Sequence, residues 1–300
     1  MAFAHPAQGV GVPGRVSRPA PKLLAVDLDG TLLDTKGQPH LRDVRAIRAA
    51  VVAGVRVSIV TGRLYSGTRA FVEQLGLNGA IACADGSHIV HASDHATLLH
   101  LGVRDADART LRSSFQRASV ATFVFARDAI GHDAAGVPFV DYVSTWSNDV
   151  RVAADVFQHD LWDADEGVTA VLAVGTRDQI VAVADDVGRR LPDAVMVAAF
   201  PMRRDPHAGQ WAMIVRNART TKGTAMRWIA AHEGLALEET VCVGDWINDV
   251  PMFDVAGRSF VMGQAPDEVK ARATDVLEHT HEDGGGVAHA LREAFGIEAG

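Results

Sequence analysis

The sequence is poor in cysteine and contains no long apolar run. Its 300 residues include only two cysteines, Cys83 and Cys242, each inside a short apolar segment. So few cysteines exclude a disulfide framework, and we expect reduced thiols in a cytoplasmic protein. No apolar run approaches the ~18 residues that a membrane-spanning helix needs. These absences favour a folded soluble protein over a secreted or membrane one.

Positive charge is also in deficit. The formal net charge is −8 at pH 7, which argues against nucleic acid or an anionic membrane surface as the main partner. A negative net charge does not exclude a local cationic pocket that binds a small anion. Residues 1–20 carry Gly and Pro throughout and lack an apolar core segment, so we expect a flexible N-terminal tail there rather than a signal peptide, and a short processed leader stays open.

The rest of the chain has the composition of a globular protein, with 48% hydrophobic and 22% charged residues. From Leu23 onward, short apolar runs alternate with segments of helical spacing. The run "LLAVDL" is followed by apolar residues at helical spacing between residues 41 and 51. The same alternation returns near the C-terminus. We therefore predict an α/β fold with a Rossmann-like parallel-sheet core, formed by residues 21–84 and 212–300.

The middle of the chain, residues 85–211, has a different rhythm. Strand patterns follow one another with only two helical stripes between them, and we expect "FVDYV" at 139–143 to be one of these strands. Such an order is typical of an antiparallel sheet backed by helices. We therefore predict an inserted α+β domain, joined to the core by hinges near 84–86 and 211–214.

The first predicted strand ends in two carboxylates. Asp27 and Asp29 lie two residues apart in "LLAVDLDGTLLD", so an extended chain points both side chains to the same face. Carboxylates held this close repel each other unless a cation lies between them. Asp-Gly is also a common turn pair. The segment alone is therefore compatible with a solvated strand end or with a divalent-cation site.

Four short polar segments stand at the ends of core strands or at the start of the next helix. In an open α/β sheet the ligand site lies beyond the carboxyl ends of the strands. Segments that are distant in sequence should therefore converge on one site. They are "DLDGT" at 27–31, "VTGR" at 60–63, "TKG" at 221–223 and "GDWIND" at 244–249.

These motifs, in this order, resemble those of the haloacid dehalogenase-like (HAD) superfamily and, within it, the Cof-type phosphatases with a large α/β cap. "FVMGQAPDEVKARA" and "EDGGGVAHAL" are similar to the Cof-type C-terminal segment. The resemblance implies a Mg²⁺-dependent phosphatase that hydrolyses a small phosphorylated metabolite, a sugar phosphate or a nucleotide-like cofactor, through an aspartyl-phosphate. A phosphomutase or phosphotransferase with the same intermediate is the alternative, and a noncatalytic metabolite-binding protein is another. The sequence leaves the oligomeric state open.

The resemblance also implies roles for the acidic residues. Asp27 would be the nucleophile, and Asp29 would act as general acid and then as general base. The magnesium ligands would be the Asp27 carboxylate, the Asp29 carbonyl and the Asp245 carboxylate, with Asp249 supporting that shell.

Four residues have the chemistry to hold a phosphoryl group. Thr61 offers a hydroxyl and Gly62 an unobstructed backbone N–H. Lys222 opens a helix, where its ammonium adds to the positive end of the helix dipole, and we expect it to be catalytic as well. Asn248 would complete this pocket.

The remaining candidates are less specific. Asp34 and Arg63 fit a turn or helix-start role as well as a substrate contact. Substrate contact and a solvated loop are both open for the residues at the first core–cap crossing and in one cap loop, namely Asp85, Gly86, Arg203, Arg204 and His207.

Two further features suggest structure more than chemistry. Trp246 could narrow the floor of the pocket or pack against the core, and we expect packing, as is usual for tryptophan. Four histidines between residues 88 and 100 fit no tight zinc-ligand spacing. We therefore do not expect a metal site in that segment.

Overall fold

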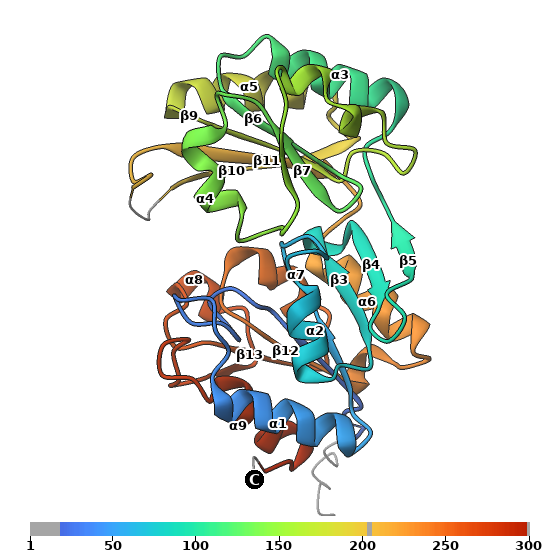
Figure 1. Ribbon diagram of the computed structural model, residues 1–300. Helices are drawn as coiled ribbons and strands as arrows, with labels where there is room; N and C mark the ends of the chain where they lie inside the picture. Colours follow the sequence, from blue (N-terminus) through green and yellow to red (C-terminus); the bar gives the residue numbers. More distant parts are fainter. Residues whose placement is uncertain (1–18, 203–205, 299–300) are drawn as a thin grey trace, which may run out of the picture.

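The computed structural model describes residues 19–202 and 206–298. It has a lower and an upper unit, stacked one above the other (Figure 1). Within the described residues the lower unit contains a five-stranded, fully parallel sheet in the order β14-β13-β12-β1-β2. Its strands are β1 (Leu23–Val26), β2 (Arg56–Ile59), β12 (Thr240–Gly244), β13 (Arg258–Val261) and β14 (Asp275–Val276).

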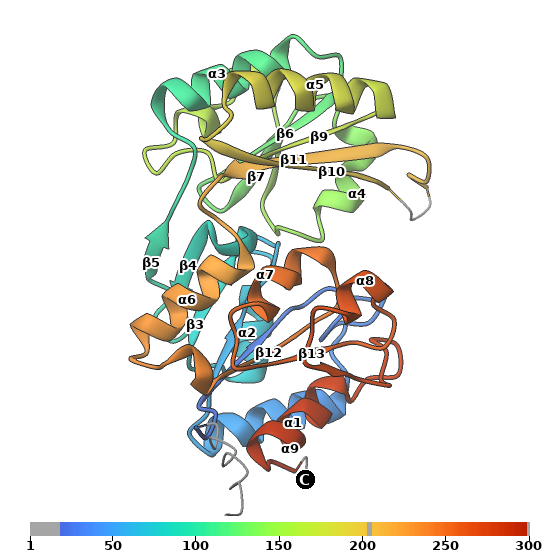
Figure 2. The ribbon, with the colours of Figure 1, turned by 180° about the vertical axis from the view of Figure 1, so that it is seen from behind.

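The apolar run of β1 explains its central place, because every residue of this strand is buried. Leu24 and Val26 pack into one hydrophobic cluster with α1, α2 and α9, and Leu23 and Ala25 pack into another with α6 and α7. A strand covered on both faces needs apolar residues at every position. The helices are α1 (Leu41–Val52), α2 (Arg69–Leu75), α6 (Lys222–His232), α7 (Val250–Phe253), α8 (Asp267–Lys270) and α9 (Gly286–Phe295). Figure 2 shows α6 and α7 from behind.

An antiparallel meander extends the core sheet at its β2 edge. Its strands are β3 (Ala80–Cys83), β4 (His88–His91) and β5 (Thr97–His100). A parallel bridge between Val60 and Ala82 joins it to the end of β2. The sequence-based boundary at residue 85 therefore falls inside this meander, because β4 and β5 pair with β3.

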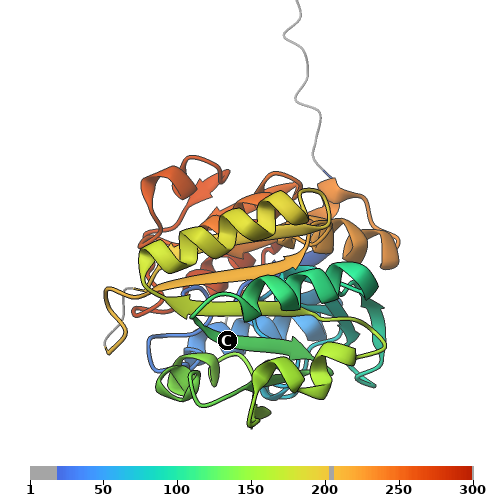
Figure 3. The same ribbon diagram turned by 90° about the horizontal axis from the view of Figure 1, so that it is seen from above.

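The upper unit, which we call the cap, contains a six-stranded sheet in the order β10-β11-β9-β6-β7-β8, antiparallel except for the β7–β8 pair. Two long helices cover its outer face (Figure 3). The elements are α3 (Asp105–Gln116), β6 (Ala121–Ala126), β7 (Ala129–His132), α4 (Val140–Val143), β8 (Val150–Val152), β9 (Ala170–Gly175), α5 (Arg177–Arg190), β10 (Val195–Pro201) and β11 (Trp211–Asn217). Short 3₁₀ turns lie at Ala84–Gly86, Val137–Phe139, Val156–Gln158, Asp160–Asp163, Leu237–Glu239 and Ile247–Asp249.

The α/β class and the inserted cap are confirmed, but the structure differs from the prediction at 139–143 and at the second domain boundary as well as at the first. The "FVDYV" segment is helical and contributes α4, since a 3₁₀ turn with Pro138 near its start (Val137–Phe139) leads directly into it. β11 pairs with β9 and β10 along its whole length. The expected boundary at residue 212 and the hinge at 211–214 therefore lie within a cap strand. In the described part of the chain, no helix is long and apolar enough to cross a membrane.

Candidate active site

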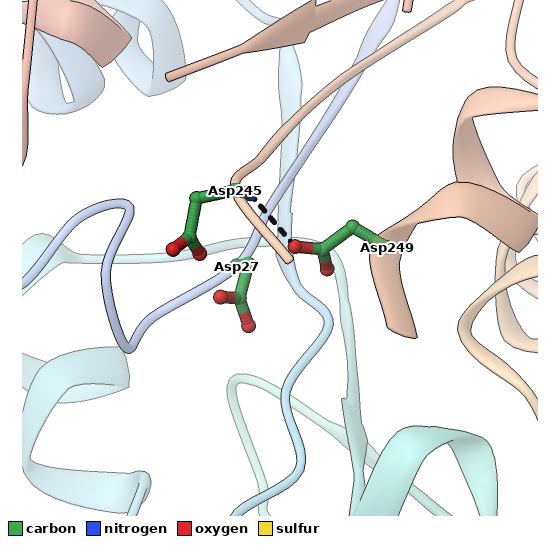
Figure 4. A group of neighbouring side chains, drawn as sticks. All are labelled: Asp27, Asp245 and Asp249. Atoms are coloured by element: carbon green, nitrogen blue, oxygen red, sulfur yellow. Dashed lines mark hydrogen bonds between the residues drawn. The ribbon is translucent and has the colours of Figure 1, made fainter. Parts of the chain in front are cut away.

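Three carboxylates converge at the carboxyl ends of two neighbouring core strands. Asp27 follows β1, and Asp245 and Asp249 follow β12 (Figure 4). All three are buried, and one oxygen from each lies within 4.8 Å of the others. Parallel pairing of β1 with β12 brings together residues that are more than 200 positions apart. The convergence expected from the motifs is therefore present for this part of the site.

Lys222 is the cation of this cluster. It is the first residue of α6, whose N-terminus is fixed by a reciprocal cap between Thr221 and Thr224. Its Nζ donates to Asp27 Oδ1 at 2.6 Å and to Asp249 Oδ1 at 2.5 Å, and the residue is only 1% exposed. Burial alone would lower the pKa of Lys222, but Asp249 and Asp27 raise it above its usual value. Lys222 is therefore charged and fixed beside the expected nucleophile.

The carboxylates exceed the positive charge available to them. Burial raises the pKa of Asp27 well above its usual range against the lowering effect of Lys222, and Asp249 and Asp245 raise it further. Burial, followed by Asp249, raises the pKa of Asp245 to about 7. Three ionised carboxylates and one ammonium would leave two negative charges. Oxygen donors with this surplus fit a divalent cation such as magnesium.

Hydrogen bonds indicate which oxygens could reach such an ion. Asp249 uses Oδ1 for Lys222, and its Oδ2 accepts the N–H groups of Asp245 and Trp246 at 2.8 and 2.9 Å. Asp245 accepts only side-chain donors among the described residues, from Thr31 at 3.1 Å and, at the limiting distance of 3.5 Å, from Gln264. Asp27 and Asp245 are therefore better placed to be ligands than Asp249, which orients the loop.

Gly30 is required between the two acidic segments. Its φ is +82°, and a Cβ at this position would collide with the Asp245 carboxylate. Any larger residue would combine backbone strain with a clash against a buried acid. The "DGT" turn thus allows the loop after β1 to pass close to the loop after β12.

Thr61 and Gly62 lie beyond the end of β2. The Thr61 N–H donates to the Ala82 carbonyl at 2.9 Å, and the Thr61 hydroxyl accepts the Arg63 N–H at 3.2 Å. Because this hydroxyl accepts from Arg63, its own proton is oriented away from that bond and can be donated to an anion. Gly62 has only the Asp85 carboxylate near its missing side chain, 3.6 Å from an ideal Cβ.

Asp29 has a different environment from Asp27. Its side chain is 51% exposed and does not belong to the carboxylate cluster. Arg63 binds it in a bidentate pair, with Nε to Oδ2 at 2.8 Å and Nη2 to Oδ1 at 2.5 Å. The expected use of the Asp29 backbone carbonyl as a ligand does not conflict with this arrangement. Sequence reasoning missed the pair, because no spacing rule links these two positions.

Asp85 forms a second buried network. Ala84, Asp85 and Gly86 have φ values of 47°, 49° and 98°, which for the first two is uncommon outside glycine and is often found at functional sites. Asp85 accepts the Asn248 side-chain amide at 3.1 Å and forms an ion pair with Arg216 of β11. Burial lowers the pKa of Arg216 to about 10. Sequence reasoning missed Arg216, although a lone arginine in the otherwise apolar segment "WAMIVRN" could have pointed to it.

The remaining candidate substrate residues either make local contacts or lie outside the described part of the chain. Asp34 accepts the N–H groups of Lys36 and Gln38, as in a turn. His207 is nearly buried and contacts Asp141 Oδ1 at 2.9 Å through Nε2. Arg203 and Arg204 lie outside the described residues.

Trp246 contradicts its expectation, since it is 44% exposed instead of packed in the core. None of the four histidines between residues 88 and 100 belongs to a possible metal-binding group of the described chain. Two of them contact threonines: His88 binds Thr97, and His100 binds Thr169.

Comparison with known proteins agrees with this geometry. The family model for haloacid dehalogenase-like hydrolases matches residues 24–291. The phosphatase YwpJ of Bacillus subtilis is 25% identical over 286 residues, which cover 90% of this chain and 99% of YwpJ. The pyridoxal phosphate phosphatase YbhA of Escherichia coli is 25% identical over 270 residues, covering 85% and 93%. A haloacid dehalogenase-like hydrolase from Bacteroides thetaiotaomicron has the same fold, with a TM-score of 0.78 at 22% identity, covering 92% of this chain and all of that one.

Proposed function

The chain belongs to the haloacid dehalogenase-like hydrolases, and from this premise we propose that it is a magnesium-dependent phosphatase of a small phosphorylated metabolite. The observation that carries the proposal is the contact of Lys222 with Asp27 inside a buried group of three carboxylates. Phosphoryl transfer requires a placed nucleophile and positive groups around the phosphoryl oxygens. This cluster supplies the nucleophile and one fixed cation.

In the first step Asp27 attacks phosphorus, the bond to the leaving oxygen breaks, and an aspartyl-phosphate forms. Lys222, the Thr61 hydroxyl and the Gly62 N–H would bind the phosphoryl oxygens. A magnesium ion held by Asp27, the Asp29 carbonyl and Asp245 would supply further positive charge when bound. The surplus of negative charge in the cluster supports this cofactor.

Asp29 is the proposed proton carrier. It would protonate the leaving oxygen in the first step and accept a proton from the attacking water in the second, a contribution of typically ~10²–10⁴-fold. Its side chain is 51% exposed, whereas Asp27 is buried. The two carboxylates, although two residues apart, therefore have environments suited to different roles.

The substrate is proposed from the relatives and the cap together. YbhA is named for pyridoxal phosphate, and a sugar phosphate or nucleotide-like cofactor remains our proposed class. Because the core groups bind only the phosphoryl end, specificity would lie in the cap. We propose that the cap spans about residues 103–217, since Val103 bridges to Val168 and the Asn217 side chain donates to the Gly102 carbonyl at 3.1 Å. A cytoplasmic location stays a prediction.

A panel of phosphorylated metabolites, assayed with magnesium and with EDTA, tests the proposal. We expect release of free phosphate that EDTA stops and that Asp27→Asn abolishes while the circular dichroism spectrum is unchanged. Isomerised sugar phosphate without free phosphate would identify a phosphomutase. Substrate binding without any turnover would favour the noncatalytic alternative. Activity of Asp27→Asn near that of the wild type would refute the nucleophile assignment.

A further inference from the structure

The segment between Arg63 and Gly67, which we call the bridging loop, makes several hydrogen bonds to the cap. The Leu64 N–H donates to the Trp146 carbonyl at 2.8 Å. The Ser66 N–H donates to Asp128 Oδ1 at 3.0 Å, and its hydroxyl donates to the Asp128 carbonyl at 2.8 Å. The Asn148 side-chain amide donates to the Ser66 carbonyl at 2.9 Å. Cap groups therefore satisfy successive polar groups of this loop.

Close packing accompanies these hydrogen bonds. A Cβ on Gly67 would lie 2.5 Å from the Trp146 carbonyl oxygen, and that oxygen is backbone, so it cannot rotate away. Leu64 is 2% exposed and belongs to the hydrophobic cluster of the inner cap face. The loop and the cap thus fit each other without space for one additional methyl group.

The first residue of the same loop holds Asp29. The Arg63 guanidinium makes the bidentate pair with Asp29, and its Nη1 contacts the Gly67 carbonyl at 3.5 Å. The guanidinium also lies over the Phe71 ring, 5.6 Å from its centroid. Arg63 is 8% exposed, so the loop conformation decides where its charged end can be.

We propose that the bridging loop couples the seating of the cap to the position of Asp29. Cap contacts fix the loop, the loop fixes Arg63, and Arg63 fixes the Asp29 carboxylate. If the cap moved away, the Leu64 and Ser66 backbone groups would pair with water instead, and the loop would gain conformational freedom. Arg63 is therefore a positioning residue, and so are the cap residues that hold the loop. This inference rests on the proposed function, since it concerns the proposed proton carrier.

The chemistry gives this coupling a distinctive signature. An alkyl phosphate has a poor leaving group that needs a proton from Asp29, whereas an aryl phosphate such as p-nitrophenyl phosphate has a good one that needs little help. Displacing Asp29 should therefore reduce turnover of the alkyl substrate much more than that of the aryl substrate. General damage to the fold would reduce both alike.

The test variant is Gly67→Ala, which adds one methyl group against the cap and changes no side chain that contacts substrate. Gly188→Ala is its matched control, because a Cβ on this cap-helix glycine meets nothing within 4 Å. We expect Gly67→Ala to lower kcat/KM for an alkyl phosphate by about tenfold or more and for p-nitrophenyl phosphate by less than about threefold. In an Asp29→Asn background the same substitution should have no further effect on the alkyl substrate.

A second variant and a spectroscopic measurement keep the inference testable if Gly67→Ala folds poorly or if the protein is not a phosphatase. Asn148→Ala removes a contact from the cap side and leaves the loop sequence intact. The ¹⁵N–¹H resonance of the Arg63 Nε–H reports its bond to Asp29 without any turnover, and it should shift in Asn148→Ala and Gly67→Ala but not in Gly188→Ala. An unshifted resonance, equal losses on both substrates, or additive losses with Asp29→Asn would each overturn the coupling. A wild type without phosphatase activity would overturn the proposed function alone.

Discussion

The acidic cluster predicts an unusual pH dependence of stability for the protein without its metal. Folding raises the pKa of Asp245 from its ordinary value of 3.8 to about 7, chiefly by burial. A carboxyl with a raised folded-state pKa binds its proton more tightly in the native state, so its contribution to stability is complete below pH 4 and is lost as the pH rises to about 7. The two values correspond to about 4 kcal/mol of unfolding free energy.

The isosteric substitution Asp245→Asn isolates this contribution. The amide can still accept the Thr31 hydroxyl but carries no charge, so the variant avoids ionising a buried group. In EDTA we expect the variant to be more stable than the wild type by only about 1 kcal/mol at pH 4.5 and by up to about 4 kcal/mol at pH 8. Urea unfolding followed by circular dichroism measures the difference in unfolding free energy at each pH, which cancels the titration of groups outside the carboxylate cluster.

Magnesium should make the wild type more stable than Asp245→Asn at pH 8. A ligand that binds only the native state stabilises it by RT ln(1 + [L]/Kd), and the variant lacks one of the two carboxylates proposed to bind the ion. Asp185→Asn, on the exposed side of α5, is the matched control and should leave both curves unchanged. Equal stability of Asp245→Asn and wild type in EDTA at pH 8 would refute the charge surplus assigned to the site.

Three further predictions concern other parts of the chain. Lys222→Met should stop turnover, and because it leaves Asp27 without its cation it should also reduce the unfolding free energy at pH 8 by about 3–5 kcal/mol. Urea unfolding measures the loss, with the exposed-site variant Lys22→Met as the control. Phe115→Ala empties a fully buried position on the inner side of cap helix α3 and should lower the unfolding free energy by about 3–5 kcal/mol, whereas a loss below about 1 kcal/mol would mean that the site collapses. His207→Ala should change the ranking of metabolite substrates more than the hydrolysis of p-nitrophenyl phosphate; equal losses in kcat/KM would assign His207 to cap packing.

The sequence was a good guide to the core because its strands are buried on both faces. A short run such as "LLAV", apolar at every position, is typical of a central strand in a sheet covered on both faces. The strand prediction for "FVDYV" was wrong. Its aromatic and β-branched residues favour strands in general, but the neighbouring proline favours the start of a helix. Domain boundaries failed for another reason: a strand pattern does not say which sheet the strand joins, as β4 and β11 demonstrate.

The site was predictable to the extent that its groups follow strand ends. Asp27, Lys222 and Asp245 could be placed together because each stands at the end or start of a core element. The Asp29–Arg63 and Asp85–Arg216 pairs could not, because they depend on the direction of side chains from separate loops and from a cap strand. Pairing of charges across elements leaves no periodic trace in a sequence.

The pairing of β1 with β12 also has a consequence for biosynthesis. Thr240 is translated roughly 200 residues after its partner Leu23, which takes about 10–40 s at ordinary rates of elongation. During that interval one edge of the central strand lacks its native neighbour, while the inserted cap can already collapse on its own core. Asp27 cannot meet Lys222 until the ribosome has passed the cap, so a nascent or prematurely terminated chain would be catalytically silent.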